Sequence, residues 1–595
     1  MGKFPYSGPI LLDLLAQKHR AGPQADLFRS GVFTLDWRAK VGSFLSPDLE
    51  MLISAGEPCG AWQPIMLETK RKVQGQKQPQ IIRTLSRPED KRTVEQNYTS
   101  LRDLPLNGYI PGSSIRGIVR AWVMGQFSSN SPEFDQMQAL LGYQEGEIIK
   151  GGKFEFLDAF PLEPTLLTLD IVNPQQNFQV FHDGQSKPLS AYTLGDGEEE
   201  IAIKVAIRGI AGQTTPAEVD KVWSWLTQAL TSKGIGSRTA SGYGQLSPVQ
   251  ASPEKALNLP PGYEQKVFDF TLLSQGNAGP KTDHPELRPT HWRGWLRSWL
   301  LRFFLGVMTP ENARFTVGEL LGTLEESTDG KQRLGTVSLR LQLDNNNGTL
   351  GNPSQEDGHL QFYQWQGQVE ITAPKAILNE IILPIIRVAV TVGGVGKGWR
   401  RPLHQFMMER RNQPSVPSAR GCHLILKHEY KNKKAPFVMP LRPEEWLGLY
   451  GRWETSVRNQ WPGRFAPQED VNAEVFSPRT CAVYSVAGPG TNLIEIAKDN
   501  DENPQWTRNL DPPETRGLGM DLIYQPDYKR KPDVGGNAAG GAGYCSWVTI
   551  KRMNTKKNGQ KEIVCVFGGT PHELRQFFLQ DLQEIDGAVH LFGDF

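Results

Sequence analysis

Two glycine-rich segments carry basic side chains that could hold a phosphate group. They run from Lys233 to Gly244 (KGIGSRTASGYG) and from Gly393 to Pro402 (GGVGKGWRRP). Glycine lets the backbone approach a phosphodiester closely, and no Asp or Glu lies between residues 221 and 253 or between residues 391 and 408. A flexible surface hairpin is the alternative interpretation of each segment. The candidate phosphate-binding residues here are Lys233, Arg238, Lys397, Arg400 and Arg401.

Two turns that lead into helices are a second kind of candidate phosphate site. Residues 108–120 (GYIPGSSIRGIVR) and 287–297 (LRPTHWRGWLR) pass from a turn into a helical stripe of apolar residues. A helix start offers unpaired backbone N–H groups and the positive end of the helix dipole. Taken alone, each start is better explained as an ordinary N-cap followed by solvated arginines. The candidate residues are Ser113, Ser114, Arg116, Arg288 and Arg293, with Arg120 and Arg297 one turn further on.

A third basic segment, residues 70–87, contains no acidic residue. Its centre, residues 75–79, is typical of a turn, and short β-type runs flank it, so we expect a projecting hairpin. The candidate phosphate-binding residues in it are Lys70, Arg71, Lys72 and Arg83.

Common nucleotide and metal motifs are missing from the sequence. Neither glycine-rich segment has the GxxxxGK[ST] order of a P-loop or the acidic residue of a dinucleotide-binding unit. The histidines do not cluster, and Cys422, His423 and His428 are better explained as strand and loop residues than as metal ligands. The 5 cysteines lack CxxC spacing, which indicates reduced thiols in a cytoplasmic protein.

The overall composition limits how the chain could bind a polyanion. Its 595 residues suffice for two or three domains, and its formal net charge is only +1. Binding of nucleic acid must therefore depend on local clusters of Lys and Arg. The first ten residues lack the plan of a signal peptide, and the apolar run 381–392 is too short to span a bilayer. We expect no membrane segment.

The elements that must position these residues occur in the same order in both halves of the chain. The first half has a strand (31–45), a helix start (108–120), Leu-Leu-Gly (140–142), a strand (153–161) and a glycine-rich segment (233–244). The second half has the same series: a strand (265–273), a helix start (287–297), Leu-Leu-Gly (320–322), a strand (336–343) and a glycine-rich segment (393–402). This repeated order predicts a duplicated domain. We expect domains at 1–258 and 259–595, with an extension from about 420 that has no counterpart and holds a strand (562–567) and a helix (571–582).

Three motifs of the first half together resemble those of the RAMP superfamily. They are "IPGSSIRG" entering a helix, "LxG" followed by the strand "FEFLDAFP", and the late loop "GIGSRTASGYGQL". The second half departs from them, with "LRPTHWRGWLRSWL" as a variant helix start and "GGVGKGWRRP" as a shortened loop. The resemblance covers most of residues 30–410. It implies an α+β fold of two tandem ferredoxin-like (RRM-type) domains with long insertions.

The resemblance also implies a function. It implies a guide-RNA-binding backbone subunit of a type III CRISPR interference complex, and two fused domains look like the fused III-D-type effectors. The basic residues named above then become predicted RNA-binding residues, and the hairpin near 70–92 becomes a thumb that interrupts the guide–target duplex. The expected partners are guide RNA, target RNA and other effector subunits, including a large subunit. The chain has no GGDD signature, so it is not the large cyclase subunit itself.

Catalysis in this family depends on an acidic residue in the loop after the first strand. The resemblance implies Asp283 in the second half and Asp48 in the first, with Asp283 holding a divalent metal, Mg²⁺, during endonuclease cleavage of target RNA. A solvated aspartate in a turn is the alternative for both. The alternative functions are a non-catalytic RNA-binding scaffold of the same complex and a repeat-processing ribonuclease. The ribonuclease would need Tyr243 or His404 as its general base.

Overall fold

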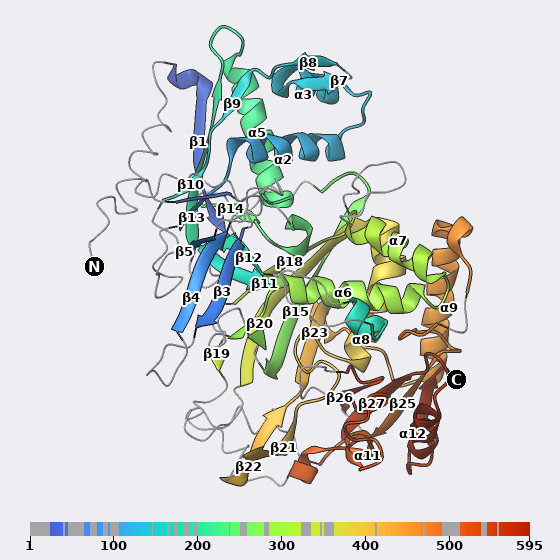
Figure 1. The fold of residues 1–595 in the computed structure, drawn as a ribbon. Helices are drawn as coiled ribbons and strands as arrows, with labels where there is room; N and C mark the ends of the chain where they lie inside the picture. Colours follow the sequence, from blue (N-terminus) through green and yellow to red (C-terminus); the bar gives the residue numbers. More distant parts are fainter. Residues whose placement is uncertain are drawn as a thin grey trace. The chain divides into compact units, whose positions relative to one another are not determined.

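The computed structural model divides the chain into two compact units (Figure 1). The first consists of residues 1–171 and 190–261, and the second of residues 172–189 and 262–595. The expected boundary at 258/259 lies close to this division, but the segment 172–189 interrupts the first unit and belongs to the second. The structure describes residues 24–39, 42–45, 65–71, 80–86, 93–95, 106–145, 147–162, 167–171, 176–183, 190–195, 200–236, 238–249, 259–275, 277–278, 285–322, 335–344, 348–349, 362–410, 413–467, 471–490, 512–536, 544–555 and 559–595.

An antiparallel sheet forms the centre of the first unit. Its strand β1 (Phe28–Leu35) lies between β13 (Ile201–Gly209) and β14 (Leu246–Pro248), and β9 (Phe154–Phe156) and β10 (Phe160–Pro161) pair with the other edge of β13. Side chains of β13 alternate between buried and half-buried over its first five residues, as expected for a sheet with one face on the core.

Helices cover the core face of this sheet. Helix α2 (Gly112–Gln126) and α5 (Pro216–Ser232) contribute Ile115 and Leu226 to a core that also holds Phe33 of β1. The capping box between Thr215 and Glu218 starts α5, with the Thr215 hydroxyl accepting from the Glu218 N–H at 3.3 Å. The sequence predicted this helix two residues shorter at its C-terminal end.

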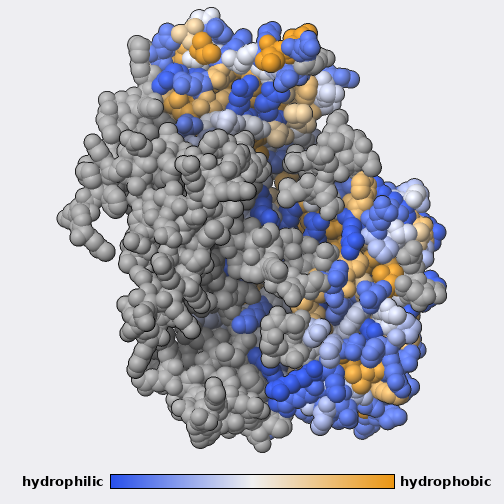
Figure 2. Space-filling model, viewed as in Figure 1, coloured by the Kyte–Doolittle hydropathy of each residue, from blue (hydrophilic) through white to orange (hydrophobic). Residues whose placement is uncertain are grey.

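Smaller elements complete the first unit. A patch of apolar side chains appears over the β7–β8 hairpin in Figure 2, where Ile148 and Ile149 are 65% and 75% exposed. The remaining elements are η1 (Ala25–Leu27), β2 (Gly42–Leu45), β3 (Ile65–Arg71), β4 (Gln80–Ser86), β5 (Thr93–Glu95), β6 (Leu106–Tyr109), α3 (Pro132–Leu141), β7 (Tyr143–Glu145), β8 (Ile148–Lys150), β11 (Leu167–Ile171), β12 (Ser190–Leu194) and η4 (Thr239–Ser241).

The second unit is built on a larger antiparallel sheet. Strand β15 (Tyr263–Gln275) pairs along its whole length with β20 (Phe362–Pro374). Strand β18 (Ser338–Leu343) lies on one side of this pair, and β23 (Cys422–Tyr430) and β24 (Lys433–Pro436) lie on the other. Other elements before the extension are α4 (Gln176–Val180), β16 (Asn277–Ala278), β17 (Pro285–Glu286), α7 (Pro310–Leu321), β19 (Gly348–Thr349), η6 (Ile377–Ile382), α8 (Leu383–Val392), β21 (His404–Arg410) and β22 (Gln413–Arg420).

Helix α6 (Pro289–Phe304) runs through the centre of the second unit. The sequence predicted one apolar stripe on it, whereas the structure also buries Leu300, Leu301 and Phe304. The extra burial arises because residues from the C-terminal extension pack on α6: the ring of Phe304 lies 6.0 Å from that of Trp453 and 5.5 Å from that of Trp461. A helix that is covered nearly all round is a core helix.

The C-terminal extension forms a third antiparallel sheet, in the order β26-β27-β25-β28. Both of its faces are buried. Within β27, Ile563 and Cys565 belong to the core around α6, and the alternating residues Val564 and Val566 belong to a second core with α11 and α12. The elements are α9 (Pro443–Gln460), η7 (Pro462–Arg464), β25 (Cys481–Ala487), η9 (Pro512–Thr515), α11 (Leu518–Tyr524), β26 (Val548–Thr555), β27 (Gly559–Phe567), α12 (Glu573–Gln583) and β28 (Val589–Phe592).

Both units contain the same pair of helices joined by the same contacts. In the first unit, Arg116 and Arg120 of α2 donate to the carbonyl oxygens of Leu141 and Gly142, where α3 ends. In the second unit, Arg293 and Arg297 of α6 donate to the carbonyl oxygens of Leu321 and Gly322, where α7 ends. The last carbonyl groups of a helix lack partners and carry partial negative charge, so a guanidinium satisfies them.

The residue just before β9 and the residue just before β18 contact the two Leu-Leu-Gly turns in the same way. The Lys153 N–H donates to the Leu140 carbonyl at 2.7 Å, and the Val337 N–H donates to the Leu320 carbonyl at 2.8 Å. The mixture of helices and antiparallel sheets confirms the predicted α+β class. Among the described residues, no helix is both long and apolar enough to cross a membrane.

The arginine contacts predict a stability effect that can be measured. Arg116→Leu and Arg293→Leu should each lower the free energy of unfolding by roughly 1–3 kcal/mol, because each leaves a half-buried helix end without its charged hydrogen bond. Arg452→Leu, at an exposed position on α9, is the control and should cost less than about 0.5 kcal/mol. Unfolding in guanidinium chloride, followed by circular dichroism, measures these changes in stability. Equal unfolding midpoints for the three variants would contradict the role of the arginines at the helix ends.

Candidate RNA interface

The first glycine-rich segment is a tightly folded loop that follows α5. The Gly244 N–H donates to the Arg38 carbonyl at 2.9 Å, and the Gly244 carbonyl accepts from the Ile235 N–H at 2.8 Å. A Cβ on Gly244 would lie 1.9 Å from the Ile235 carbonyl oxygen, and its φ is +65°, so only glycine fits there. Lys233 is exposed at the start of this loop and Arg238 is half-buried within it.

The start of α2 is capped by an acidic side chain. The Gly112 N–H donates to Asp158 Oδ1 at 2.7 Å, although no acid is near this helix in the sequence. Ser113 is exposed and Ser114 is half-buried. A carboxylate at a helix start already stabilises the positive end of the dipole and opposes a second anion. Of the predicted RNA-binding residues at this turn, Ser113 is the exposed one. Arg116 donates instead to the Leu141 carbonyl at the end of α3.

The start of α6 is held by a neutral histidine. The backbone N–H of Arg288 donates to His291 Nδ1 at 3.0 Å, which requires that this nitrogen carry no proton. Burial and the neighbouring charge of Arg288 lower the pKa of His291 to about 3, so the ring stays neutral at physiological pH. Arg288 itself is buried, and Arg293 is half-buried with a contact to the Leu321 carbonyl. Arg288 and Arg293 therefore help to pack α6 against its neighbours.

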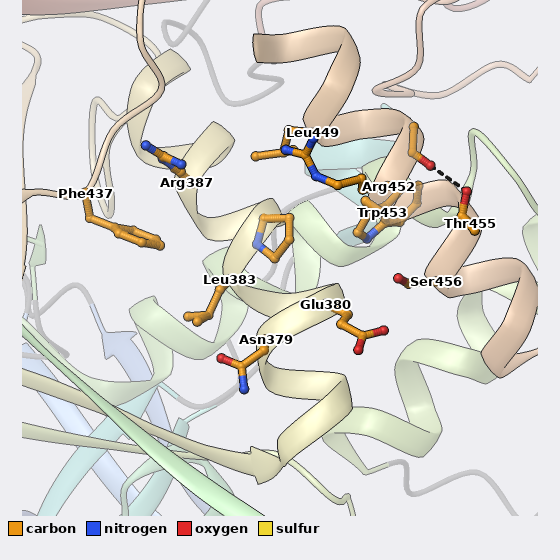
Figure 3. A pocket seen from close by; sticks show the side chains of 12 residues that line it. Asn379, Glu380, Leu383, Arg387, Phe437, Leu449, Arg452, Trp453, Thr455 and Ser456 are labelled. Carbon is orange, nitrogen blue, oxygen red and sulfur yellow. Dashed lines mark hydrogen bonds between the residues drawn. The ribbon is translucent and has the colours of Figure 1, made fainter. Parts of the chain in front are cut away.

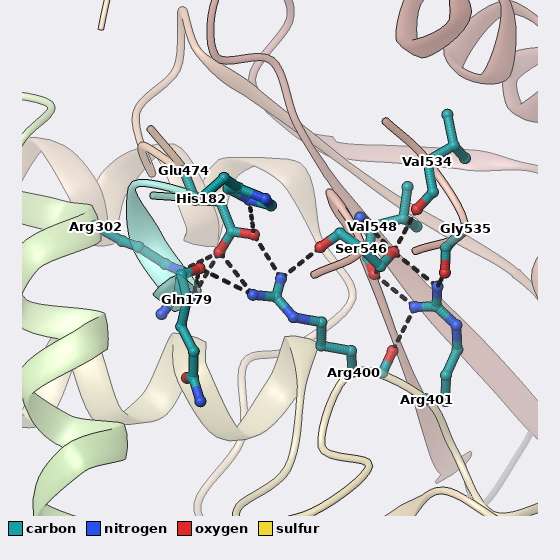
Figure 4. A network of polar contacts seen from close by, with 10 residues as sticks. All are labelled: Gln179, His182, Arg302, Arg400, Arg401, Glu474, Val534, Gly535, Ser546 and Val548. Atoms are coloured by element: carbon teal, nitrogen blue, oxygen red, sulfur yellow. Dashed lines mark hydrogen bonds and ion pairs between the residues drawn. The ribbon is translucent and has the colours of Figure 1, made fainter. Parts of the chain in front are cut away.

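The arginines of the second glycine-rich segment hold it in place through buried contacts (Figure 4). Arg400 Nη1 and Nη2 lie 2.6 and 3.3 Å from the two carboxylate oxygens of Glu474, a forked ion pair. Arg401 donates to the Val548 carbonyl at 2.6 Å and to the Ser546 hydroxyl at 2.7 Å. These contacts direct both guanidinium groups into the second unit. Lys397, by contrast, is exposed at the tip of the segment.

Glu474 is the centre of this network of buried charges. Arg302 of α6 donates to it at 2.8 Å through Nε, and His182 of the segment 172–189 lies 2.9 Å away through Nε2. Burial alone would raise the pKa of the Glu474 carboxyl, but the charges of Arg400 and Arg302 and the hydrogen bond with His182 hold it well below its usual range. Glu474 is therefore ionised at neutral pH.

The basic hairpin forms as the sequence predicted. Strands β3 and β4 pair antiparallel from Ile65↔Ser86 to Arg71↔Gln80, and β5 pairs with β4. Lys70 and Arg71 are the last two residues of β3, and Arg83 lies in the middle of β4. Lys72 lies outside the described residues. The pairing places Arg83 opposite Glu68, and the RNA-binding role of the hairpin stays a prediction.

The predicted catalytic residues cannot be compared with the structure, because Asp48 and Asp283 both lie outside the described residues. In the described part of the chain, no group of three or more His, Cys, Asp or Glu side chains is arranged to hold a metal ion. The roles of Asp283, Asp48 and Mg²⁺ remain predictions. The two alternative general bases, Tyr243 and His404, are fully buried, so neither can take a proton from RNA directly.

A cavity of about 700 Å³ lies elsewhere in the second unit, between α8 and α9 (Figure 3). Leu383, Phe437 and Leu449 give it apolar walls, while Arg387 and Glu380 line it with opposite charges. It contains none of the predicted RNA-binding residues. Its mixed lining does not have the basic character that a phosphate backbone requires.

Comparison with known proteins supports part of this picture. Residues 91–247 match the model of the RAMP superfamily, which confirms the resemblance found in this stretch of the sequence. None of the curated proteins compared with the chain matches it.

The solved structures that are similar to the chain include two from Pyrococcus furiosus. Cmr6 is 19% identical, with 37% of this chain and 97% of Cmr6 covered and a TM-score of 0.19. Apo Cmr1 is 11% identical, with 55% of this chain and 99% of Cmr1 covered and a TM-score of 0.29. A chain of a Type IV-B CRISPR complex is 14% identical, with 39% of this chain and 94% of that chain covered and a TM-score of 0.18.

The Glu474 network predicts a large stability effect. Glu474→Ala should lower the free energy of unfolding by roughly 3–5 kcal/mol, because Arg302 and Arg400 would keep buried charges without their counter-ion. Glu319→Ala removes a half-exposed carboxylate that pairs with Arg464, and it should cost about 1 kcal/mol or less. Thermal unfolding of both variants measures the difference, and similar losses would contradict the central role of Glu474.

The same carboxylate predicts how stability changes in acid. The pKa of Glu474 lies below its ordinary value of 4.5, so its stabilising effect is complete above about pH 4.5 and is lost as the pH falls. Glu474→Gln should be less stable than wild type at neutral pH but should lose less stability between pH 5 and pH 3. Parallel pH profiles for the two proteins would show that Glu474 is not the titrating group.

Proposed function

We propose that the chain is a guide-RNA-binding backbone subunit of a type III CRISPR interference complex, built on two tandem ferredoxin-like RAMP domains. The observation that carries the proposal is the RAMP match over residues 91–247, which spans α2, its Leu-Leu-Gly turn and the loop at Lys233. The tandem arrangement is supported by the second unit, whose α6 and α7 repeat the arginine contacts of α2 and α3. Target RNA, a large subunit and other effector subunits are the expected partners.

The exposed lysines of the two glycine-rich loops are the residues best suited to contact the guide. Lys233 and Lys397 are exposed on segments with no acid nearby in the sequence, and the tight folding of both loops fixes their positions. The chain has a net charge of only +1, so these local groups and the β3–β4 hairpin must supply the attraction to phosphate. We assign the hairpin near 70–92 the role of the thumb at the guide–target duplex.

Cleavage of target RNA is the catalytic part of the proposal. Asp283 lies between the strand β15 and the start of α6, and Asp48 follows β2 in the first unit. A carboxylate in either loop would hold a divalent cation, Mg²⁺, against the scissile phosphate. A non-catalytic scaffold is the alternative, and a metal-dependent cleavage assay separates the two.

Lys233 and Lys397 provide the test of RNA binding. Wild type should bind single-stranded RNA with an affinity that falls steeply with salt, at a log–log slope of about −0.7 for each phosphate contact. Lys233→Ala combined with Lys397→Ala should weaken binding by roughly tenfold and make the slope less steep by about 1.4, with unchanged thermal stability. The control is Lys433→Ala, at an exposed position in β24. A flat salt profile for the wild-type chain in a filter-binding titration would rule out the proposal.

Asp283→Asn tests the catalytic role. The substitution keeps the shape of the side chain and removes its charge, so cleavage of labelled target RNA at one position should disappear while target binding stays the same. The assembled complex is assayed with and without Mg²⁺. If the cleavage ladder of the Asp283→Asn complex matches that of wild type, Asp283 is not the catalytic carboxylate, and Asp48→Asn is tested in the same way.

A further inference from the structure

The cavity between α8 and α9 is an open groove with apolar walls (Figure 3). Its volume of about 700 Å³ is in the range that ligand-binding pockets have. Leu383 and Pro384 come from α8, and Leu449 and Trp453 come from α9, while Phe437 follows β24. Such a lining suits a large apolar side chain, because that side chain leaves water when it enters the groove.

Two arginines lie on one side of this groove. Arg387 Nε donates to the Val438 carbonyl at 3.0 Å, which holds the side chain in place, and Arg452 is exposed on α9. Among the described residues, no carboxylate forms an ion pair with either guanidinium group. In Figure 3 both arginines lie along the upper side of the cavity, and Glu380 lies along its lower side. The upper side is therefore suited to carboxylates.

Two glycines of α9 lie beside the groove, although the packing of the chain does not require them. Among the described residues, a Cβ on Gly451 would meet no atom within 4 Å beyond its own stretch of helix, and one on Gly448 would meet only Arg452 Nη1, at 3.3 Å. Glycine destabilises the interior of a helix relative to alanine. Two positions without side chains on α9 do, however, let another backbone approach this helix closely.

The segment that leads into α8 has an unusual backbone. It is η6, a π-helical segment, in which hydrogen bonds join residues five apart. Such segments are rare and frequently occur at functional sites. Asn379 and Glu380 of η6 line the groove. The glycines of α9 and the backbone of η6 are therefore two independent observations that point to a function for this groove.

Helix α12 of the same unit presents a stripe of side chains that is complementary to the groove. Glu573, Phe577, Gln580 and Glu584 are all exposed, and Phe577 is 47% exposed. Their spacing of three or four residues places them on one face of the helix. The opposite face packs into a core, where Leu582 is fully buried. The stripe thus has an aromatic ring one turn after one carboxylate and two turns before another. We call these four exposed residues the Phe577 stripe.

We propose that the groove between α8 and α9 binds the Phe577 stripe of a second copy of the chain. Phe577 enters the apolar groove, and Glu573 and Glu584 lie beside Arg387 and Arg452. An aromatic anchor in a pocket with a polar, charged rim is the usual arrangement of a specific interface. The inference goes beyond the proposed function, because RNA takes no part in this contact.

Glu380 fixes the orientation of the docked helix. It lies across the groove from the two arginines, where it repels a glutamate, so the helix binds with its carboxylates toward the arginines. Each copy carries one groove and one stripe. A contact is therefore either returned by the second copy, which closes a dimer, or continued by a third copy. A single helix in a groove is a small interface, so the association is reversible and depends on concentration.

Sedimentation velocity of the full chain tests the inference, after nuclease treatment so that RNA cannot link two copies. The sedimentation coefficient of wild type should rise over about a hundredfold range of concentration. Gly451→Leu, which places a side chain beside the groove and favours the helix, should leave the chain monomeric without lowering its melting temperature. Phe577→Ala should weaken the association by roughly tenfold. Tyr430→Ala, at an aromatic residue that is 56% exposed, is the control and should not change it.

Reversal of charge tests the pairing itself. Arg452→Glu alone, and Glu573→Arg combined with Glu584→Arg, should each stay monomeric, because groove and stripe then carry like charges. An equal mixture of these two proteins should associate again, because each groove meets a stripe of opposite charge on the other protein. Lys433→Glu makes the same change in charge at an exposed position in β24 and should associate as wild type does.

A wild-type chain that stays monomeric at every concentration overturns the inference. So does association that Gly451→Leu or Phe577→Ala leaves unchanged, and so does a mixture of the two charge-reversed proteins that remains monomeric. The proposed function fails separately: lack of RNA binding by the wild-type chain refutes it and has no effect on self-association.

Discussion

The buried carboxylate of Glu474 is the constraint on which the second unit depends. It is fully buried and contacts Arg302 of α6, Arg400 of the glycine-rich segment and His182 of the segment 172–189. Buried charges are stable only when each has a partner in good geometry, so these elements are fixed together. The network also explains why residues 172–189 belong to the second unit: His182 pairs with Glu474 and stacks on Trp547 with ring centres 3.9 Å apart.

This constraint shapes the surface that we assign to RNA. With Arg400 and Arg401 committed to the interior, the second glycine-rich segment is held from within and presents Lys397. The first glycine-rich loop is also tightly folded and also presents an exposed lysine, Lys233, but close packing of Gly244 on Ile235 holds it in place of buried arginines. In both units, the arginines of the helix starts instead satisfy the ends of the following helices. Rigid loops with few exposed lysines suit specific positioning of a strand better than bulk attraction.

Much of the local structure could be predicted from the sequence, because it depends on short-range patterns. The hairpin around residues 70–87, the helix at 217–230 and the helix at 571–582 all lie within or close to the observed elements. The site was harder to predict because acidic partners come from distant parts of the chain. Asp158 lies 46 residues after Gly112, and Glu474 lies 74 residues after Arg400, so acid-free stretches of sequence did not mean acid-free surroundings. The spacing of the arginines before each Leu-Leu-Gly was a signal that could have indicated their helix-end role.

The central claim is that the chain holds a guide RNA, and sequencing of the nucleic acid that co-purifies with it tests this claim most directly. The chain is purified from its native cells at moderate salt, so that phosphate contacts persist. The account predicts short RNAs of narrow length distribution that share one constant end and differ in the remainder. A preparation free of nucleic acid, or one that carries only random fragments of abundant cellular RNA, would contradict it.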